Sequence, residues 1–390
     1  MQKEEKDLRI YRNDVYHCAK CHMCKSIDFN EIKNERFTEI CPSGSQLLFE
    51  AYFSSGKMEI ARALLNQEII PSPKLLEIFY KCTLCGGCTE VCSIQKELRP
   101  SDVFHAVRSW IIKNKVGPLP GHKELIDDIL NNNNPWGHDP KERGKWAEDF
   151  GIPPISDETE VIFFVGGVSS YDTKGQELAK NIVEIFKKMN LKFGILGEEE
   201  ACCGSPVLII GDHQSFDKIY EKNLETFLKY NKPIVTACSG CYNMLQNVYN
   251  LKSHKIQVFH IAEYLLKLMR KNRITFSKKI EKIITYHDPC HLGRHSKIYD
   301  PPRKLLAKIP GVKFVEMDRI REFSFCCGAG GGVKKVFPDY AVDVAKERIE
   351  EALSKDADIL VSACPFCERN FRDAGGIEVK DIVELVLEAI

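Results

Sequence analysis

The sequence predicts an α+β protein of several domains: an all-α N-terminal domain, followed by two copies of an α/β domain with a parallel sheet. Three observations predict this fold class. Apolar residues recur at helical spacing between residues 42 and 80. After residue 160, apolar strands alternate with amphipathic helices, and this part of the chain repeats itself. A chain of 390 residues is long enough for two or three domains with buried cores.

The helical domain is expected over residues 1–115. Leu47, Leu48 and Ala51 recur at the helical period, which predicts a helix there. The stretch VFHAVRSWII, residues 103–112, is expected to be its closing helix.

A linker is expected over residues 116–158, because Asn, Gly and Pro are frequent there. Its one predicted helix is short and lies near residues 122–130. The stretch NNNNPWG within the linker is expected to be a solvated turn.

The two α/β copies are expected over residues 159–275 and 276–390. In each copy a strand leads into a turn, a second strand runs into a Cys-Cys-Gly turn, a third ends in Cys-x-x-Cys, and a fourth strand and a helix close the copy. Because the carboxyl ends of parallel strands meet at one edge of a sheet, each copy is expected to gather its cysteines there. The segments are 161–167, 191–196, 233–241 and 258–268 in the first copy, and 283–290, 312–317, 358–367 and 377–390 in the second.

The composition excludes some classes of function. Lys plus Arg and Asp plus Glu are 55 each, so nothing in the net charge points to nucleic acid or to an anionic membrane. The polar N-terminus has no apolar signal core, and no long apolar stretch appears. We therefore expect a cytoplasmic protein. Its 17 cysteines are odd in number and clustered, which favours metal ligands or redox groups over disulfides.

The first two cysteine groups have the Cys-x-x-Cys-x-x-Cys spacing of bacterial ferredoxins, which predicts two cubane 4Fe–4S clusters. In that arrangement the fourth ligand comes from the other run. A zinc site is expected to show two separated Cys-x-x-Cys pairs, which fits these runs poorly. The predicted ligand sets are Cys18, Cys21, Cys24 and Cys92 for one cluster, and Cys82, Cys85, Cys88 and Cys41 for the other.

The remaining cysteines fall into one set in each α/β copy. Gly167, or its neighbour Gly166, stands where the second copy has Cys290, so the first copy has four cysteines and not five. Three outcomes remain for the first set: a modified 4Fe–4S cluster, a zinc ion or an empty pocket. The sets are Cys202, Cys203, Cys238 and Cys241 in the first copy, and Cys290, Cys326, Cys327, Cys364 and Cys367 in the second.

Two ferredoxin runs followed by two such cysteine sets resemble the family of the D-type heterodisulfide reductase proteins, with their duplicated cysteine-rich CCG domains. Similar proteins include the iron–sulfur subunits of glycolate, lactate and glycerol-3-phosphate oxidases. The resemblance implies that Cys290, Cys326, Cys327, Cys364 and Cys367 hold a catalytic noncubane 4Fe–4S cluster. The glycines of GAGGG, residues 328–332, are then expected to leave room for a substrate.

The same resemblance implies an oxidoreductase subunit that relays electrons through the two cubane clusters to the noncubane cluster, which reduces a disulfide. The alternative is an electron-transfer subunit of a flavin-dependent glycolate, lactate or glycerol-3-phosphate dehydrogenase complex. A zinc-stabilised scaffold is the third possibility. The implied partners are a flavoprotein or a membrane b-type cytochrome and a small thiol or disulfide. Such a partner could hold the chain on the inner face of the membrane.

Polar residues near Cys290 allow two interpretations each. His287, His291 and His295 could donate a proton to a leaving thiolate or could hold the loop by hydrogen bonds. Arg294 could meet an anionic substrate or form a salt bridge.

Overall fold

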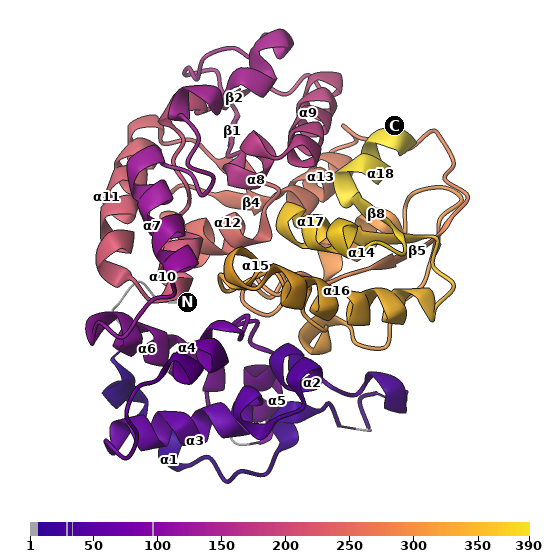
Figure 1. The fold of residues 1–390 in the computed structure, drawn as a ribbon. Coiled ribbons are helices and arrows are strands. Elements are labelled where there is room, and N and C mark those ends of the chain that lie inside the picture. The colour runs from indigo at the N-terminus through magenta and orange to yellow at the C-terminus, as the bar shows by residue number, and fades with distance from the viewer. Residues whose placement is uncertain (1–6, 29, 33, 96) are drawn as a thin grey trace.

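The computed structural model describes residues 7–28, 30–32, 34–95 and 97–390 (Figure 1). A helical N-terminal part lies below two α/β parts, each built on a four-stranded parallel sheet. The predicted fold class is therefore confirmed. No helix in these ranges is long and apolar enough to cross a membrane. The predicted domain boundaries at residues 115, 158 and 275 stay predictions.

The N-terminal helices pack around α6, the helix predicted over 103–112. Its Val103, Ala106 and Val107 are completely buried, and α3 and α4 contact it. Pro100 at the first turn of α6 has a backbone dihedral suited to a helix start. The helices are α1 (Arg12–Tyr16), α2 (Pro42–Leu47), α3 (Ser54–Leu65), α4 (Pro73–Tyr80), α5 (Gly87–Gln95) and α6 (Pro100–Lys113).

The linker packs against the α/β parts through α7 (Pro120–Asn132), which contacts α10 (Ser205–Ile210), α11 (His213–Tyr230) and α15 (Val333–Val336). The prediction of a solvated NNNNPWG turn is wrong at Asn134, which is completely buried. Its side-chain oxygen accepts hydrogen bonds from the backbone N–H groups of Trp136 and His138, at 3.0 and 3.3 Å. Its amide nitrogen donates to two backbone carbonyls. A buried asparagine that satisfies its own loop cannot be recognised from composition.

The two sheets have the same topology. The orders are β2-β1-β3-β4 and β6-β5-β7-β8, with every pairing parallel. Each strand lies within a segment that the sequence predicted. The strands are β1 (Val161–Phe163), β2 (Phe193–Ile195), β3 (Ile234–Thr236), β4 (Val258–His260), β5 (Ile283–Tyr286), β6 (Lys313–Phe314), β7 (Ile359–Ser362) and β8 (Glu378–Asp381).

The helices of the two α/β parts show the duplication as well. The closing helices α13 and α18 each begin with a capping box, at His260 and Glu263 and at Asp381 and Glu384. The two helices also contact each other. The helices are α8 (Gly166–Tyr171), α9 (Thr173–Lys188), α10 (Ser205–Ile210), α11 (His213–Tyr230), α12 (Ser239–Asn243), α13 (Ile261–Arg270), α14 (Asp300–Leu306), α15 (Val333–Val336), α16 (Pro338–Leu353), α17 (Pro365–Ala374) and α18 (Ile382–Ala389).

Arg108 of α6 joins all three parts. Its guanidinium is completely buried and donates to the carbonyls of Phe79 and Cys82 in the helical part. It also donates to Ile209 O in the first α/β part at 3.0 Å and to Gly331 O in the second at 2.8 Å. One side chain therefore fixes the helical part against both sheets.

Candidate iron–sulfur sites

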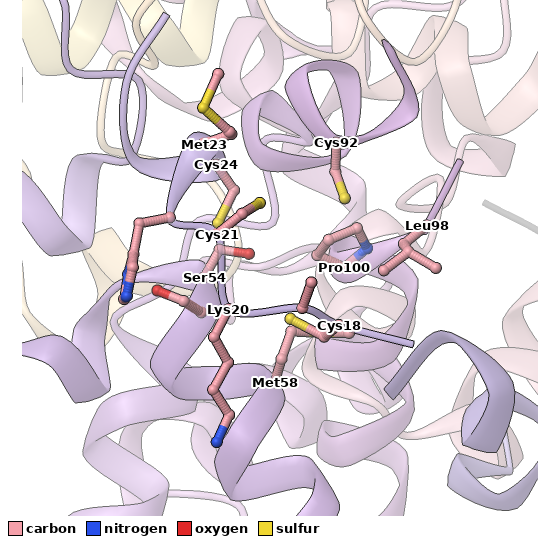
Figure 2. Close-up of a pocket in the computed structure, with 13 residues that line it drawn as sticks. Cys18, Lys20, Cys21, Met23, Cys24, Ser54, Met58, Cys92, Leu98 and Pro100 are labelled. Atoms are coloured by element: carbon pink, nitrogen blue, oxygen red, sulfur yellow. The ribbon is translucent and has the colours of Figure 1, made fainter. Parts of the chain in front are cut away.

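Four cysteines of the helical part line one cavity, which we call the outer set: Cys18, Cys21, Cys24 and Cys92 (Figure 2). Cys92 comes from α5, and the other three come from the run before it. Cys21 is exposed, whereas burial raises the pKa of Cys24 to about 11 against an opposing hydrogen bond with Ser54. The structure thus brings together the run and the distant cysteine that the ferredoxin spacing paired; their role as ligands stays a prediction.

The other cysteines of the helical part, Cys41, Cys82, Cys85 and Cys88, form the inner set. Burial raises the pKa of Cys88 far above its usual value, and the charges of Cys41, Cys82 and Cys85 raise it further. Each of these sulfurs is therefore close enough to Cys88 to interact with it. Thiols in such surroundings stay neutral unless a metal stabilises their ionised form.

Buried cations beside the inner set fit an anionic centre. Lys57 is 1% exposed, and its ammonium group donates to Ser43 Oγ at 2.8 Å. The buried guanidinium of Arg108 donates to the carbonyl of Cys82. In the described part of the chain, no carboxylate forms a salt bridge with either cation. Buried charges are normally paired or lie near metal sites, so an iron cluster held by four thiolates would supply the missing negative charge.

All five cysteines of the second α/β copy meet in one buried set, the second CCG set. All five lie in one buried cluster of contacting side chains, and neighbouring sulfurs shift one another's pKa along the series Cys290, Cys326, Cys327, Cys367 and Cys364. Interactions with Cys326 and Cys367 lower the pKa of Cys327 well below its usual value. The loops after β5, β6 and β7 carry these cysteines, as the shared strand edge predicts.

Sulfur contacts connect neighbouring sets. Cys85 of the inner set lies in the same buried cluster as the second CCG set, and its interaction with Cys326, together with burial, raises its pKa far above the usual value. Cys238 of the first copy packs against the buried cluster that contains Cys364 of the second. Ser239 Oγ donates to Ala363 O across the same junction, at 2.8 Å. The order along these contacts is therefore inner set, second CCG set, first CCG set.

The first CCG set consists of Cys202, Cys203, Cys238 and Cys241, whose thiols shift one another's pKa in the order 202–203–241–238. Phe164 N donates to Val235 O of β3, and His287 N donates to Val361 O of β7. Gly167 and Cys290 each lie three residues after the donor, so strand register places Gly167 where the second copy has Cys290. A Cβ atom on Gly167 would lie 2.8 Å from the Trp136 ring. The linker tryptophan thus takes the space that a side chain on Gly167 would need, whereas a Cβ atom on Gly166 would lie 3.3 Å from Cys241 Sγ, at the first CCG set.

The glycine run GAGGG packs against the inner set. A Cβ atom on Gly331 would lie 2.9 Å from the Cys82 carbonyl oxygen, and one on Gly332 would lie 2.8 Å from His122. Both glycines also have positive φ, which favours glycine. These two glycines therefore allow the two parts to approach closely, and their space is filled by the neighbouring turn and helix, not left for a substrate.

Two of the polar residues near Cys290 hold the loop. His295 Nε2 lies 3.2 Å from Leu84 O. Arg294 donates to Cys85 O at 2.7 Å and to Ser324 O, so the prediction of a salt bridge or a substrate contact is replaced by bonds to backbone carbonyls. His291 Nδ1 lies 3.7 Å from Cys290 Sγ, and burial lowers the pKa of His291 to about 4.

The sequence did not reveal a buried charge network behind the second CCG set. Arg319, Arg348 and Glu351 are all completely buried. Glu351 accepts from Arg319 Nε at 2.9 Å and from Arg348 Nη1 at 2.5 Å. Arg348 Nε in turn donates to His287 Nδ1 at 3.3 Å. Charged residues in an amphipathic helix such as α16 are usually exposed, so no sequence signal marked Arg348 and Glu351 as buried.

Sets of buried, mutually contacting thiols beside buried cations define an iron–sulfur protein, and the family models agree. A "4Fe-4S dicluster domain" matches residues 14–95, and a "Cysteine-rich domain" matches residues 161–246 and 284–372. The chain belongs to the family of the D-type heterodisulfide reductase proteins. It is an iron–sulfur oxidoreductase component with a role in electron transfer.

Similar curated proteins support this assignment. The chain is 36% identical to the D subunit of the dihydromethanophenazine:CoB–CoM heterodisulfide reductase of Methanosarcina barkeri, over 96% of this chain and 93% of that protein. It is 37% identical to the corresponding protein of Methanosarcina mazei, over 87% and 85%. A probable iron–sulfur-binding oxidoreductase of Bacillus subtilis, FadF, is 31% identical over 89% of this chain and 51% of that protein.

Proposed function

We propose that this chain carries electrons from its surface to the second CCG set, where a disulfide takes up two electrons and two protons and leaves as two thiols. The observation that carries the proposal is that Cys85 packs in the same buried cluster as Cys326 and the other cysteines of the second CCG set. It puts a ferredoxin-type set in direct contact with the five-cysteine set, so no additional carrier is needed between them.

The depth at which each cysteine set lies in the protein fits a different step of the proposed electron path. Bound clusters would supply one-electron redox chemistry at each set. Cys21 is exposed, so a partner can reach the outer set, whereas Cys85 and Cys326 are buried and kept from water. We propose two cubane clusters on the outer and inner sets and a noncubane cluster on the second CCG set. His291 lies next to Cys290, but burial keeps its imidazole neutral near pH 7, so it is not the source of the proton for a departing thiolate.

The relatives support a disulfide substrate. The two Methanosarcina proteins are named as reductases of a heterodisulfide of two thiol coenzymes, and this chain covers most of their length. We extend the class, a disulfide of small thiols, to this chain. Its partners are then further redox subunits, either a flavoprotein or a membrane b-type cytochrome that holds the chain at the inner membrane face.

Spectroscopy of the oxidised, iron-loaded protein tests the proposal. Added coenzyme M or coenzyme B is expected to produce a new paramagnetic signal, and Cys326→Ser is expected to abolish it. Cys202→Ser is the matched control, since Cys202 holds the corresponding place in the first copy and its loss leaves the signal in place. If no thiol gives a signal, and the reduced protein leaves the disulfide of these coenzymes intact, disulfide reduction is wrong.

The incomplete first set favours a second candidate function. The first copy has four cysteines and no counterpart of Cys290, so the two copies cannot hold a disulfide between two equal clusters. A protein that only relays electrons between a hydroxy-acid-oxidising flavoprotein and a membrane carrier does not require such a pair. Fast oxidation of the reduced protein by a quinone, with no thiol-dependent signal, would favour this relay.

A further inference from the structure

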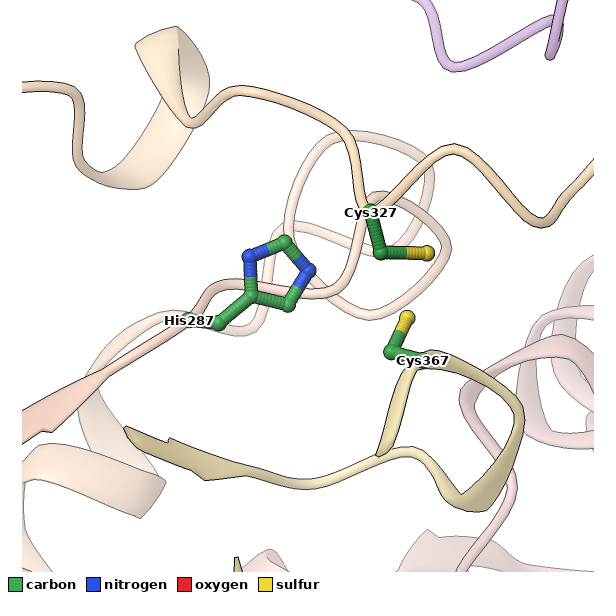
Figure 3. A group of neighbouring side chains, drawn as sticks. All are labelled: His287, Cys327 and Cys367. Atoms are coloured by element: carbon green, nitrogen blue, oxygen red, sulfur yellow. The ribbon is translucent and has the colours of Figure 1, made fainter. Parts of the chain in front are cut away.

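His287 lies at the end of β5, completely buried beside two cysteines of the second CCG set. Its ring nitrogen and the sulfurs of Cys327 and Cys367 all lie within 4.8 Å of one another (Figure 3). Its edge packs on Phe371 with ring centroids 4.9 Å apart. In the described structure its Nε2 has no hydrogen-bond partner. The residue is thus either a metal ligand or a hydrogen-bond donor to sulfur.

Arg348 decides between these roles. Its Nε donates to His287 Nδ1 at 3.3 Å, and an arginine cannot give up its proton in a protein. Nδ1 must therefore present its lone pair to Arg348, and the proton of the neutral imidazole must be on Nε2. Glu351, itself held by Arg319, fixes the Arg348 guanidinium in this place.

A histidine that binds a metal through one nitrogen normally donates the N–H of the other to a carboxylate or carbonyl. His287 has the opposite arrangement, because its second nitrogen faces a donor. Binding iron through Nε2 would leave both nitrogens without a proton, next to Arg348. The arrangement therefore suits an N–H donor and does not suit a ligand.

We propose that His287 holds its Nε2–H toward Cys327 and Cys367, donates it to a sulfur of the cluster bound there, and so raises the reduction potential of that centre. The inference rests on the proposed function, since it requires an iron–sulfur cluster on the second CCG set. Hydrogen bonds to sulfur stabilise the more negative, reduced state of such a cluster. His287 is a positioning residue in this sense and does not touch the reacting disulfide.

The first copy supplies a natural comparison. Phe164 N donates to Val235 O, and His287 N donates to Val361 O, so the two residues hold the same place after their strands. Phe164 is also completely buried. The fold thus accepts an aromatic ring without nitrogens at this place, which implies that the histidine serves the sulfurs and not the packing. It follows that any centre in the first copy lacks this donor.

Redox titration of the iron-loaded protein, followed by electron paramagnetic resonance, tests the proposal. His287→Phe copies the first copy and removes the donor, whereas His287→Gln keeps an N–H near the position of Nε2. We expect the phenylalanine variant to keep its iron and to lower the reduction equilibrium constant of the second CCG centre about tenfold, which is about 59 mV for one electron. The glutamine variant is expected to show less than half of that shift.

Two results would overturn the inference and leave the proposed function standing. Loss of iron in both variants would make His287 a ligand, and an unchanged potential in His287→Phe would give it a structural role only. A different result would remove the proposed function and this inference together. That result is an iron content of Cys327→Ser equal to the iron content of the unaltered protein.

Discussion

Replacing Glu351 by glutamine removes the negative charge from a completely buried network. Glu351 accepts from Arg319 and Arg348, and all three side chains are inaccessible to solvent. Glutamine has nearly the same shape, so the change leaves two buried guanidinium groups without their shared counter-charge. Glu347 still contacts Arg319, at 3.0 Å, which limits the loss. Breaking a buried ion pair by removing one partner costs about 3–5 kcal/mol, and we expect a loss of stability in this range.

Anaerobic urea unfolding of the iron-loaded protein, followed by circular dichroism, measures the effect. Glu350→Gln is the matched control, because Glu350 is the preceding residue of α16 and pairs with an exposed Arg36. An exposed pair contributes about 0–1 kcal/mol, so this control should change little. A loss below about 1 kcal/mol for Glu351→Gln, or equal losses in the two variants, would refute the view that the network stabilises the second α/β part.

Three further predictions concern other parts of the chain. Burial lowers the pKa of His122 to about 4, so its neutral form stabilises the fold fully above pH 6.5. This contribution, about 3 kcal/mol, is lost as the pH falls toward 4. The difference in unfolding free energy between the unaltered protein and His122→Gln should therefore shrink over that pH range, and a constant difference would contradict this. Cys92→Ser should remove about four irons per chain from the outer set, as measured by iron analysis. Paramagnetic resonance should show that the thiol-dependent signal of the second CCG set stays intact. An unchanged iron content would exclude Cys92 as a ligand. Gly167→Cys should cost about 1–3 kcal/mol through its clash with Trp136, and adding Trp136→Ala should recover part of this in thermal unfolding; full stability of the single variant would show that the ring moves aside freely.

The sequence predicted the strands and the cysteine grouping because both depend on local spacing. Each of the eight strands falls in a predicted apolar segment before a turn, and period and turn residues are properties of neighbouring positions. The ferredoxin spacing likewise paired Cys92 with the distant run that it adjoins in the structure.

The order of the sets and the residues that support them could not be predicted in this way. Contacts such as Cys85 with Cys326 depend on how the three parts dock, which no local pattern encodes. Arg108 stands in an apolar helix where a charged residue looks like an exception, yet it bonds to carbonyls far away in sequence. The prediction for Asn134 was wrong for the same reason, because composition reports the chance of exposure and not the partners of one side chain.

The exposure of Cys21 has a consequence for the resistance of the protein to dioxygen. Among the thiols of the outer set, this one meets solvent most directly, and oxidants attack accessible thiolates first. If the outer set holds a cluster, as we propose, damage by dioxygen would begin at this exposed cysteine and would interrupt the proposed electron path at its surface end. The buried sulfurs of Cys326 and Cys327 would then stay intact but without an electron supply, and reassembly of the outer cluster alone would restore electron transfer.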